Sequence, residues 1–182
     1  MIANSRNSNF HFHFPKGFWY KSVIDSFTKY VKRNPLPWDT VENFMAAQIQ
    51  SVSFPGLTMP TVSQTRRLGK QQEYKSSTNV ADLFDRNLTI TFKAVDGYVN
   101  YWISLENAMR YYDFENKAQY MEDMQMRFLD QDGSIMYTIK YNKVILTGIS
   151  ELSMSYSDNN PNFKTFSMTF SFYDMKMVIE HD

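Results

Sequence analysis

Cysteine is absent from this chain of 182 residues. Without thiols the chain can form no disulfide, no thiolate nucleophile and no cysteine-ligated zinc site. No apolar run approaches the roughly 20 residues that span a bilayer, so we expect no membrane insertion. Hydrophobic residues make up 43% of the chain and charged residues 21%, which is ordinary for a globular protein and argues against a wholly disordered or collagen-like chain.

Neither sign of charge is in excess. Nineteen basic residues balance nineteen acidic residues, so the formal net charge is zero. The whole-chain electrostatic field therefore favours neither a nucleic acid nor an acidic substrate, and it gives little protection against self-association. The length fits a single domain over residues 1–182. Residues 1–9 are rich in Asn and Ser, which is typical of a flexible N-terminal arm.

Sequence motifs for catalysis are missing as well. The sequence has no phosphate-binding loop, no dinucleotide-binding glycine pattern, no serine-hydrolase elbow and no zinc-protease helix. His11 and His13 share one face of a predicted strand and could begin a metal site, but the third histidine, His181, is far away in sequence. The carboxylates between Asp113 and Asp132 are better explained as solvated charges at strand ends than as an acid–base pair. We therefore expect neither an enzyme nor a bound cofactor.

Aromatic residues are plentiful, at 16% of the chain, and there are 12 methionines. Apolar residues alternate with polar ones at period two in many short segments, which predicts β-strands. The predicted strands cover residues 10–14, 47–54, 88–92, 125–129, 135–141, 143–149, 152–156 and 163–173. This pattern is typical of a mainly antiparallel β protein, a sandwich or a barrel.

Two segments have helical rather than strand periodicity. Residues 18–34 form the first predicted helix, which ends at Pro35. A second helix follows Asp96, which can cap it. That helix has a strong amphipathic pattern, the kind that packs its apolar stripe on a core. The stripe contains Tyr98, Trp102, Leu105, Met109 and Tyr112, whereas Asn100, Ser104, Asn107 and Arg110 lie away from it.

Residues 61–77 form a segment without a core face, which we call the polar hairpin. The segment is extended, polar on both faces and turns at Gly69. Such a hairpin is marginally stable by itself and needs a surface to pack on. Its basic residues favour binding to phosphates or docking on an acidic protein surface, and its single aromatic residue argues against a base-stacking platform. The candidate docking residues are Arg66, Arg67, Lys70, Glu73, Tyr74 and Lys75.

The order of these segments carries a resemblance to a known family. A strand ends in Ser53-Phe54-Pro55-Gly56, the polar hairpin follows, and the segment from Asn79 to Phe92 precedes the amphipathic helix. The block from Ile149 to Asn159 then leads into the last predicted strand. Over roughly residues 46–177 the sequence resembles the tail tube proteins of contractile-tailed, T4-like bacteriophages. It departs from them by a helical insertion over residues 15–44.

The resemblance implies a structural virion protein with an antiparallel β-sandwich or barrel and a flanking helix. Subunits of that family form stacked six-membered rings, through which phage DNA is ejected without specific binding. The implied partners are the protein itself, the tail sheath, the baseplate and the tail terminator, in a particle assembled in the host cytoplasm. The polar hairpin would stack one ring on the next. The insertion would lie on the outer surface, with Trp19, Tyr20, Lys29, Lys32, Arg33 and Trp38 as its candidate contact residues.

Other functions remain open from the sequence alone. A tube-initiating baseplate protein and the tube of a related secretion system share the implied fold. A nucleic-acid-binding β-barrel would use the aromatic residues and the basic hairpin. A small hydrolase would use the carboxylates between Asp113 and Asp132.

Overall fold

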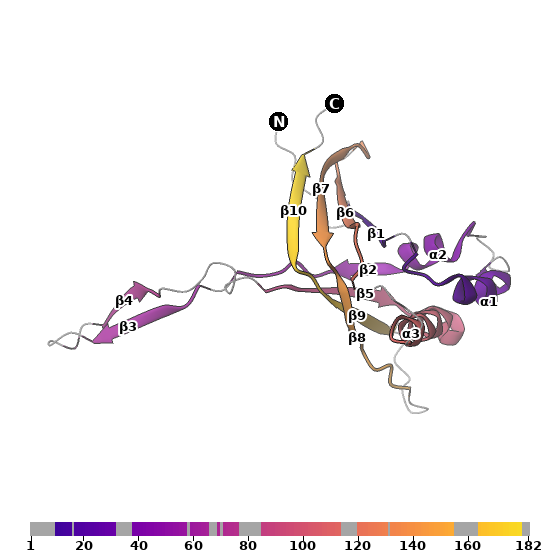
Figure 1. Ribbon diagram of the computed structural model, residues 1–182, viewed down its shortest axis with the longest axis horizontal. Coiled ribbons are helices and arrows are strands. Elements are labelled where there is room, and N and C mark those ends of the chain that lie inside the picture. Colours follow the sequence, from indigo (N-terminus) through magenta and orange to yellow (C-terminus); the bar gives the residue numbers. More distant parts are fainter. Residues whose placement is uncertain are drawn as a thin grey trace.

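Figure 1 shows the computed structural model of the chain, in which helices lie at one end of the longest axis and a thin hairpin at the other. The structure describes residues 10–15, 17–31, 38–57, 59–65, 69, 71–76, 85–113, 120–130, 132–154 and 164–179.

Four antiparallel strands form an open sheet, which we call sheet I. Their spatial order is β1-β6-β7-β10. Met124 and Met126 alternate with polar residues, so both point to the same face and both are buried. Tyr141 lies opposite Met124 and is buried with it. The strands of sheet I are β1 (Phe10–His13), β6 (Met124–Leu129), β7 (Ile135–Asn142) and β10 (Asp174–Ile179).

Four more antiparallel strands form sheet II, in the order β2-β5-β9-β8. In the central pair, Ile90 lies opposite Met168 and Phe92 opposite Phe166, and all four side chains are fully or almost fully buried. The ladder between β2 and β5 shifts register near Ser51, where the sequence pattern also breaks. The strands of sheet II are β2 (Ile49–Val52), β5 (Asn87–Lys93), β8 (Ile145–Ile149) and β9 (Thr165–Ser171).

The connection between β1 and β2 closes the core. It contains α1 (Lys21–Val31) and α2 (Val41–Ala47). Phe44 and Met45 of α2 are fully buried. The side chain of Thr40 caps α2 by accepting a hydrogen bond from the N–H of Asn43 at 3.1 Å, as expected for a threonine before a helix. This connection is therefore part of the core and not an appendage on it.

The second predicted helix is present as α3 (Val99–Tyr111), but it buries the opposite face to the expected one. Asn100, Ser104 and Asn107 are fully buried, whereas Trp102 and Met109 are 51% and 61% exposed. The buried amides are satisfied by the backbone of neighbouring segments. Buried amides that keep all their hydrogen bonds cost little, so they can take the place of an apolar stripe.

Asn107 joins α3 to the segment that precedes α1. Its Oδ1 accepts the N–H of Tyr20 at 3.0 Å, and its Nδ2 donates to the carbonyl of Phe18 at 2.9 Å. Asn100 makes the corresponding link to sheet II, because its Nδ2 donates to the carbonyl of Lys93 at 2.7 Å. The helix does not begin with an Asp96 cap. It follows a 3-10 turn, η2 (Asp96–Tyr98), and its N-cap residue Tyr98 makes no side-chain capping bond.

Two further strand predictions are corrected. Residues 151–154 form no strand, and residues 155–156 lie outside the described residues. The last predicted strand, residues 163–173, corresponds to β9, and it is followed by a strand that was not predicted: the chain leaves sheet II after Ser171, turns at Tyr173 and joins sheet I as β10. The remaining predicted strands are confirmed. The mainly antiparallel β class with flanking helices is confirmed as well.

We expect Asn107→Ala to lower the free energy of unfolding by about 2 kcal/mol, because the Tyr20 N–H would lose its partner in a buried position. Met109→Ala on the exposed face of the same helix is the matched control and should change it by less than about 0.5 kcal/mol. Urea titrations of both variants measure this difference. Equal effects of the two substitutions would contradict the assignment of the buried face.

Candidate functional site

The polar hairpin lies apart from the rest of the chain in Figure 1. Its strands, β3 (Thr61–Thr65) and β4 (Gln71–Lys75), pair in antiparallel register from Thr61 opposite Lys75 to Thr65 opposite Gln71. All ten side chains are exposed. A two-stranded ladder that is solvated on both faces has no core of its own, so its rigidity depends on another surface.

The two faces of the polar hairpin differ in chemistry. Val62 lies opposite Tyr74, which gives one face an apolar pair. Thr61 lies opposite Lys75, and Ser63 opposite Glu73 on the other, fully polar face. Of the candidate docking residues, the structure therefore places Glu73, Tyr74 and Lys75. Arg66, Arg67 and Lys70 lie outside the described residues.

The candidate contact residues of the insertion do not share one surface. Trp19 is only 3% exposed, with its ring 4.8 Å from that of Phe18, so its predicted place on the outer surface is wrong. A large indole ring contributes much more to stability inside the core than on the surface. Tyr20 and Trp38 are half-buried and Lys29 is exposed, while Lys32 and Arg33 lie outside the described residues.

A groove of about 590 Å³ runs between α1 and α3. Arg110 and Glu106 form an ion pair, with 4.0 Å between Arg110 Nη2 and Glu106 Oε1. Asp113 has no ion-pair partner among the described residues. The groove is therefore apolar and has one net negative charge. It could not be predicted from the sequence, because the apolar stripe of α3 that lines it was expected to be buried in the core. The lining residues are Phe27, Val99, Trp102, Glu106, Met109, Arg110 and Asp113.

The face of sheet II opposite the core is rich in hydroxyl groups, and we call it the hydroxyl face. Lys93 is the single charged residue in all four strands of the sheet. The helix α3 packs on the other face, where the ring of Tyr101 lies 5.4 Å from that of Phe166. Lys93 lies on the hydroxyl face, and a single charge is few for a sheet surface exposed to solvent. The members of the hydroxyl face are Ser51, Thr89, Thr91, Thr147, Ser167, Thr169 and Ser171.

Both sheets have unpaired outer strands in the described chain. Sheet I ends at β1 and β10, and sheet II ends at β2 and β8. On β10, Met177 and Ile179 are 58% and 55% exposed, although Met177 lies opposite Ile139 in a row that is buried at Met126. The apolar row therefore extends onto the edge strand β10, where the described chain leaves it exposed. An edge of this kind is a template for pairing with another chain.

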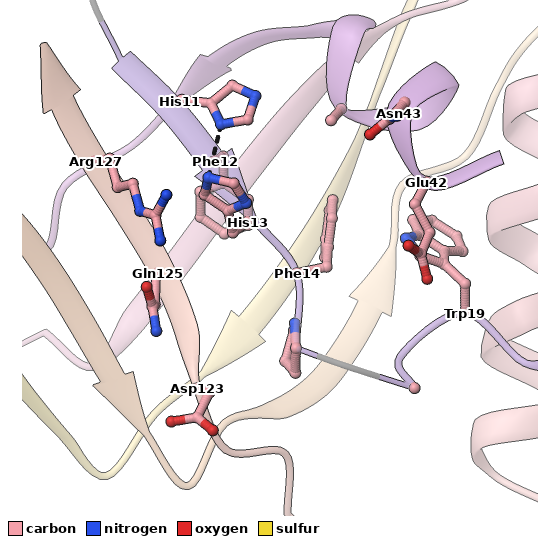
Figure 2. Close-up of a pocket in the computed structure, with 13 residues that line it drawn as sticks. His11, Phe12, His13, Phe14, Trp19, Glu42, Asn43, Asp123, Gln125 and Arg127 are labelled. Carbon is pink, nitrogen blue, oxygen red and sulfur yellow. Dashed lines mark hydrogen bonds between the residues drawn. The ribbon is translucent and has the colours of Figure 1, made fainter. Parts of the chain in front are cut away.

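A pocket of about 600 Å³ lies beside β1 (Figure 2). His11 Nδ1 and His13 Nε2 are 2.7 Å apart, and Arg127 lies opposite His11 on β6. The indole N–H of Trp19, which lines the same pocket, is buried and has no hydrogen-bond partner among the described residues. No group of three or more His, Asp or Glu side chains that could hold a metal occurs within the described residues. The carboxylates at Glu122, Asp123 and Asp132 are exposed.

The surroundings of His13 in this pocket lower its pKa. Burial, together with the nearby His11 ring and the Arg127 guanidinium, lowers the pKa of His13 from 6.5 to about 4. The folded state therefore favours neutral His13. As the pH falls, the unfolded state binds a proton at His13 at a higher pH than the folded state does. Its contribution to stability is complete above pH 6.5 and is lost as the pH falls from there towards 4.

We therefore expect the free energy of unfolding to decline between pH 6.5 and pH 4, and His13→Gln to make that decline shallower. Asn43→Gln, which changes a non-titrating residue of the same pocket, is the control and should leave the slope unchanged. Urea titrations at several pH values measure the slope. An unaltered slope in His13→Gln would show that other groups cause the decline.

No helix in the described part of the chain is long and apolar enough to cross a bilayer. No family model matches the sequence, and no curated protein matches it.

Solved structures do match. The tube-terminating cap of the anti-feeding prophage superposes with a TM-score of 0.52 at 10% identity, over 99% of this chain and 94% of that one. A chain of the anti-feeding prophage baseplate matches with a TM-score of 0.49 at 11% identity, over 98% and 97% of the two chains. A chain of the sheath/tube terminator of the PVC extracellular contractile injection system matches with a TM-score of 0.43 at 14% identity, over 71% and 84%.

The first of these matches shows a shared fold over nearly the full length of both chains. This protein therefore has the tail tube type of fold, mainly antiparallel β with flanking helices, that the sequence resemblance implies.

Proposed function

We propose that this protein is a structural subunit of the inner tube of a contractile phage tail. Identical copies form six-membered rings, the rings stack into a hollow tube, and phage DNA leaves the particle through the bore. The single observation that carries this proposal is the polar hairpin, because an exposed ladder without a core face gains its stability from another molecule. The fold shared with a tube-terminating cap supports the same function.

Lateral contacts in the proposed ring use the open sheet edges. Main-chain groups of an outer strand pair with an outer strand of the next copy, which extends a sheet across the subunit boundary. Contacts of this head-to-tail kind close into a ring when the rotation between copies closes, and they continue as a filament when it does not. The exposed Met177 and Ile179 on β10 would be buried by such a neighbour.

The hydroxyl face of sheet II lines the bore in this proposal. A bore through which DNA moves has to avoid holding phosphates, and each Lys or Arg on its wall would add an attraction that depends on salt. Short hydroxyl side chains remain hydrated and carry no charge. Lys93 lies on this face but is the one charged residue in the four strands of sheet II, so the face carries few charges that could hold phosphates.

The helices lie on the side of the fold away from the hydroxyl face and would face outward, towards the sheath. The baseplate and the tail terminator would contact the two ends of the tube. The particle would be assembled in the host cytoplasm, and the mature location would be the virion. No catalytic step is part of this function.

A position at the end of the tube is the second candidate, and the match to a tube-terminating cap favours it. A cap or a tube-initiating baseplate subunit would form one ring and not a long stack. Negative-stain electron microscopy of the purified protein separates these outcomes directly, since long tubes support the main tube and single rings support an end position.

A nucleic-acid-binding barrel is the rival from a different class. The described polar hairpin has one aromatic side chain, Tyr74, and the hydroxyl face has no aromatic residue, so neither offers a surface on which bases could stack. Filter binding across a salt series would test it, and tight binding of single-stranded DNA at low salt would favour the rival.

Replacing residues 61–75 with a short Gly-Ser linker should leave the fold intact, because the ladder makes no contribution to the core. We expect rings or monomers by electron microscopy and no long tubes. As a control, a variant with Glu73→Gln alone should still assemble. Long tubes from the deletion variant would disprove the stacking role of the hairpin.

A second experiment tests the position of the hydroxyl face. Thr91→Lys combined with Ser171→Lys should make assembled tubes retain short DNA fragments at low salt, with release as salt is raised. Met136→Lys, at an exposed position of sheet I, adds a charge elsewhere and is the control. If both sets of tubes retain equal amounts of DNA, the hydroxyl face does not line the bore.

A further inference from the structure

The outer face of α3 is the most apolar exposed helix surface in the described chain. Trp102, Met109 and Tyr112 are each more than half exposed, and the groove between α1 and α3 continues this surface through Phe27 and Val99. A contiguous apolar surface with a tryptophan at its centre is typical of a protein–protein contact.

The exposure of this surface is built into the fold. The amides of Asn100 and Asn107 fix the opposite side of α3 to the backbone of sheet II and of the segment before α1. Rotating the helix to bury Trp102 would leave both amides and the Tyr20 N–H without partners. The stripe therefore stays available to another molecule.

The polar hairpin is chemically complementary to this groove. The segment 61–77 contains four basic residues, Arg66, Arg67, Lys70 and Lys75, against one acidic residue, Glu73. The groove contains Glu106 and Asp113 against Arg110, which gives it the opposite sign. The apolar pair Val62 and Tyr74 on one face of the hairpin matches the apolar floor of the groove.

The hairpin of one chain cannot reach the groove of the same chain. Figure 1 shows β3 and β4 at one end of the longest axis, with α1 and α3 at the other. Two surfaces at opposite ends of one molecule can meet only between copies, in a head-to-tail contact that repeats from copy to copy. Such a contact places the hairpin of each copy against the helices of the next.

We propose that the groove between α1 and α3 is the receiving site for the polar hairpin of a second copy. The hairpin enters with Val62 and Tyr74 against Trp102 and Met109, and its net positive charge meets the net negative charge of the groove. This inference rests on the proposed function, because it names the surface on which the stacking hairpin docks.

The cysteine-free sequence allows a direct test by crosslinking. Val62→Cys and Met109→Cys are made in separate chains, mixed under assembly conditions and oxidised. We expect a disulfide between two different chains in high yield, and none when Val62→Cys is mixed with Met136→Cys, an exposed control on sheet I. If Met109→Cys impairs assembly, Arg110→Cys provides a second position in the same groove.

The possible outcomes separate this inference from the proposed function. Crosslinking at the groove but not at Met136→Cys supports the inference. Tubes that require the hairpin but show no crosslink at the groove overturn the inference and leave the proposed function in place. A chain that forms neither rings nor tubes overturns both.

A charge exchange gives a second, independent readout. Asp113→Lys should raise the protein concentration needed for assembly by about tenfold, because it gives the groove the same sign of net charge as the hairpin. Lys75→Glu in the same chain should restore part of the assembly, since it lowers the net positive charge of the hairpin. Assembly that is unaffected by Asp113→Lys, or that is not restored by the second substitution, would contradict the proposed contact.

Discussion

The register between β5 and β9 determines both surfaces of sheet II. Leu88 lies opposite Phe170, Ile90 opposite Met168, and Phe92 opposite Phe166, so one face is entirely apolar. The same register places the threonines and serines between them on the other face. A shift of one residue would move every apolar side chain to the outside and every hydroxyl into the core. The pairing therefore sets the core and the hydroxyl face together.

The apolar surface of this chain extends beyond what the chain can cover. The row through Met126 and Ile139 continues to the exposed Met177 on β10, and the stripe of α3 faces solvent around Trp102. With a formal net charge of zero, little electrostatic repulsion opposes contact between copies. The assembly proposed above would cover both of these apolar surfaces.

Much of the fold could be predicted from the sequence, because strands such as residues 87–93 and 165–171 alternate strictly and leave no choice of face. The polar hairpin could be recognised for the opposite reason, since it has no apolar face to bury. The burial of Trp19 could not be predicted, because its position in the core depends on contacts with residues distant in sequence. The strand β10 was not predicted, because Met177, Val178 and Ile179 follow one another without alternating with polar residues.

The orientation of α3 shows the limit of periodicity as a guide. The apolar stripe and the polar stripe of this helix have the same period, so the pattern defines two faces without showing which one is buried. Asn100, Ser104 and Asn107 follow the spacing of a buried face. The two amides reach backbone groups of other segments that no sequence pattern identifies in advance, whereas Ser104 donates to the carbonyl of Asn100 in the same helix. Amides and hydroxyls at such spacing could have indicated the alternative orientation.

Directional bonds position α3 in a way that apolar packing cannot. Packed hydrocarbon side chains tolerate small slides and rolls, whereas an amide that loses its alignment loses its hydrogen bond. The Tyr112 hydroxyl adds a third attachment by donating to the carbonyl of Leu146 on β8. These bonds therefore prevent α3 from rotating its exposed apolar stripe into the core of the same chain. In the proposed contact the stripe is already in its binding orientation before a second copy arrives, so little conformational entropy is lost on docking.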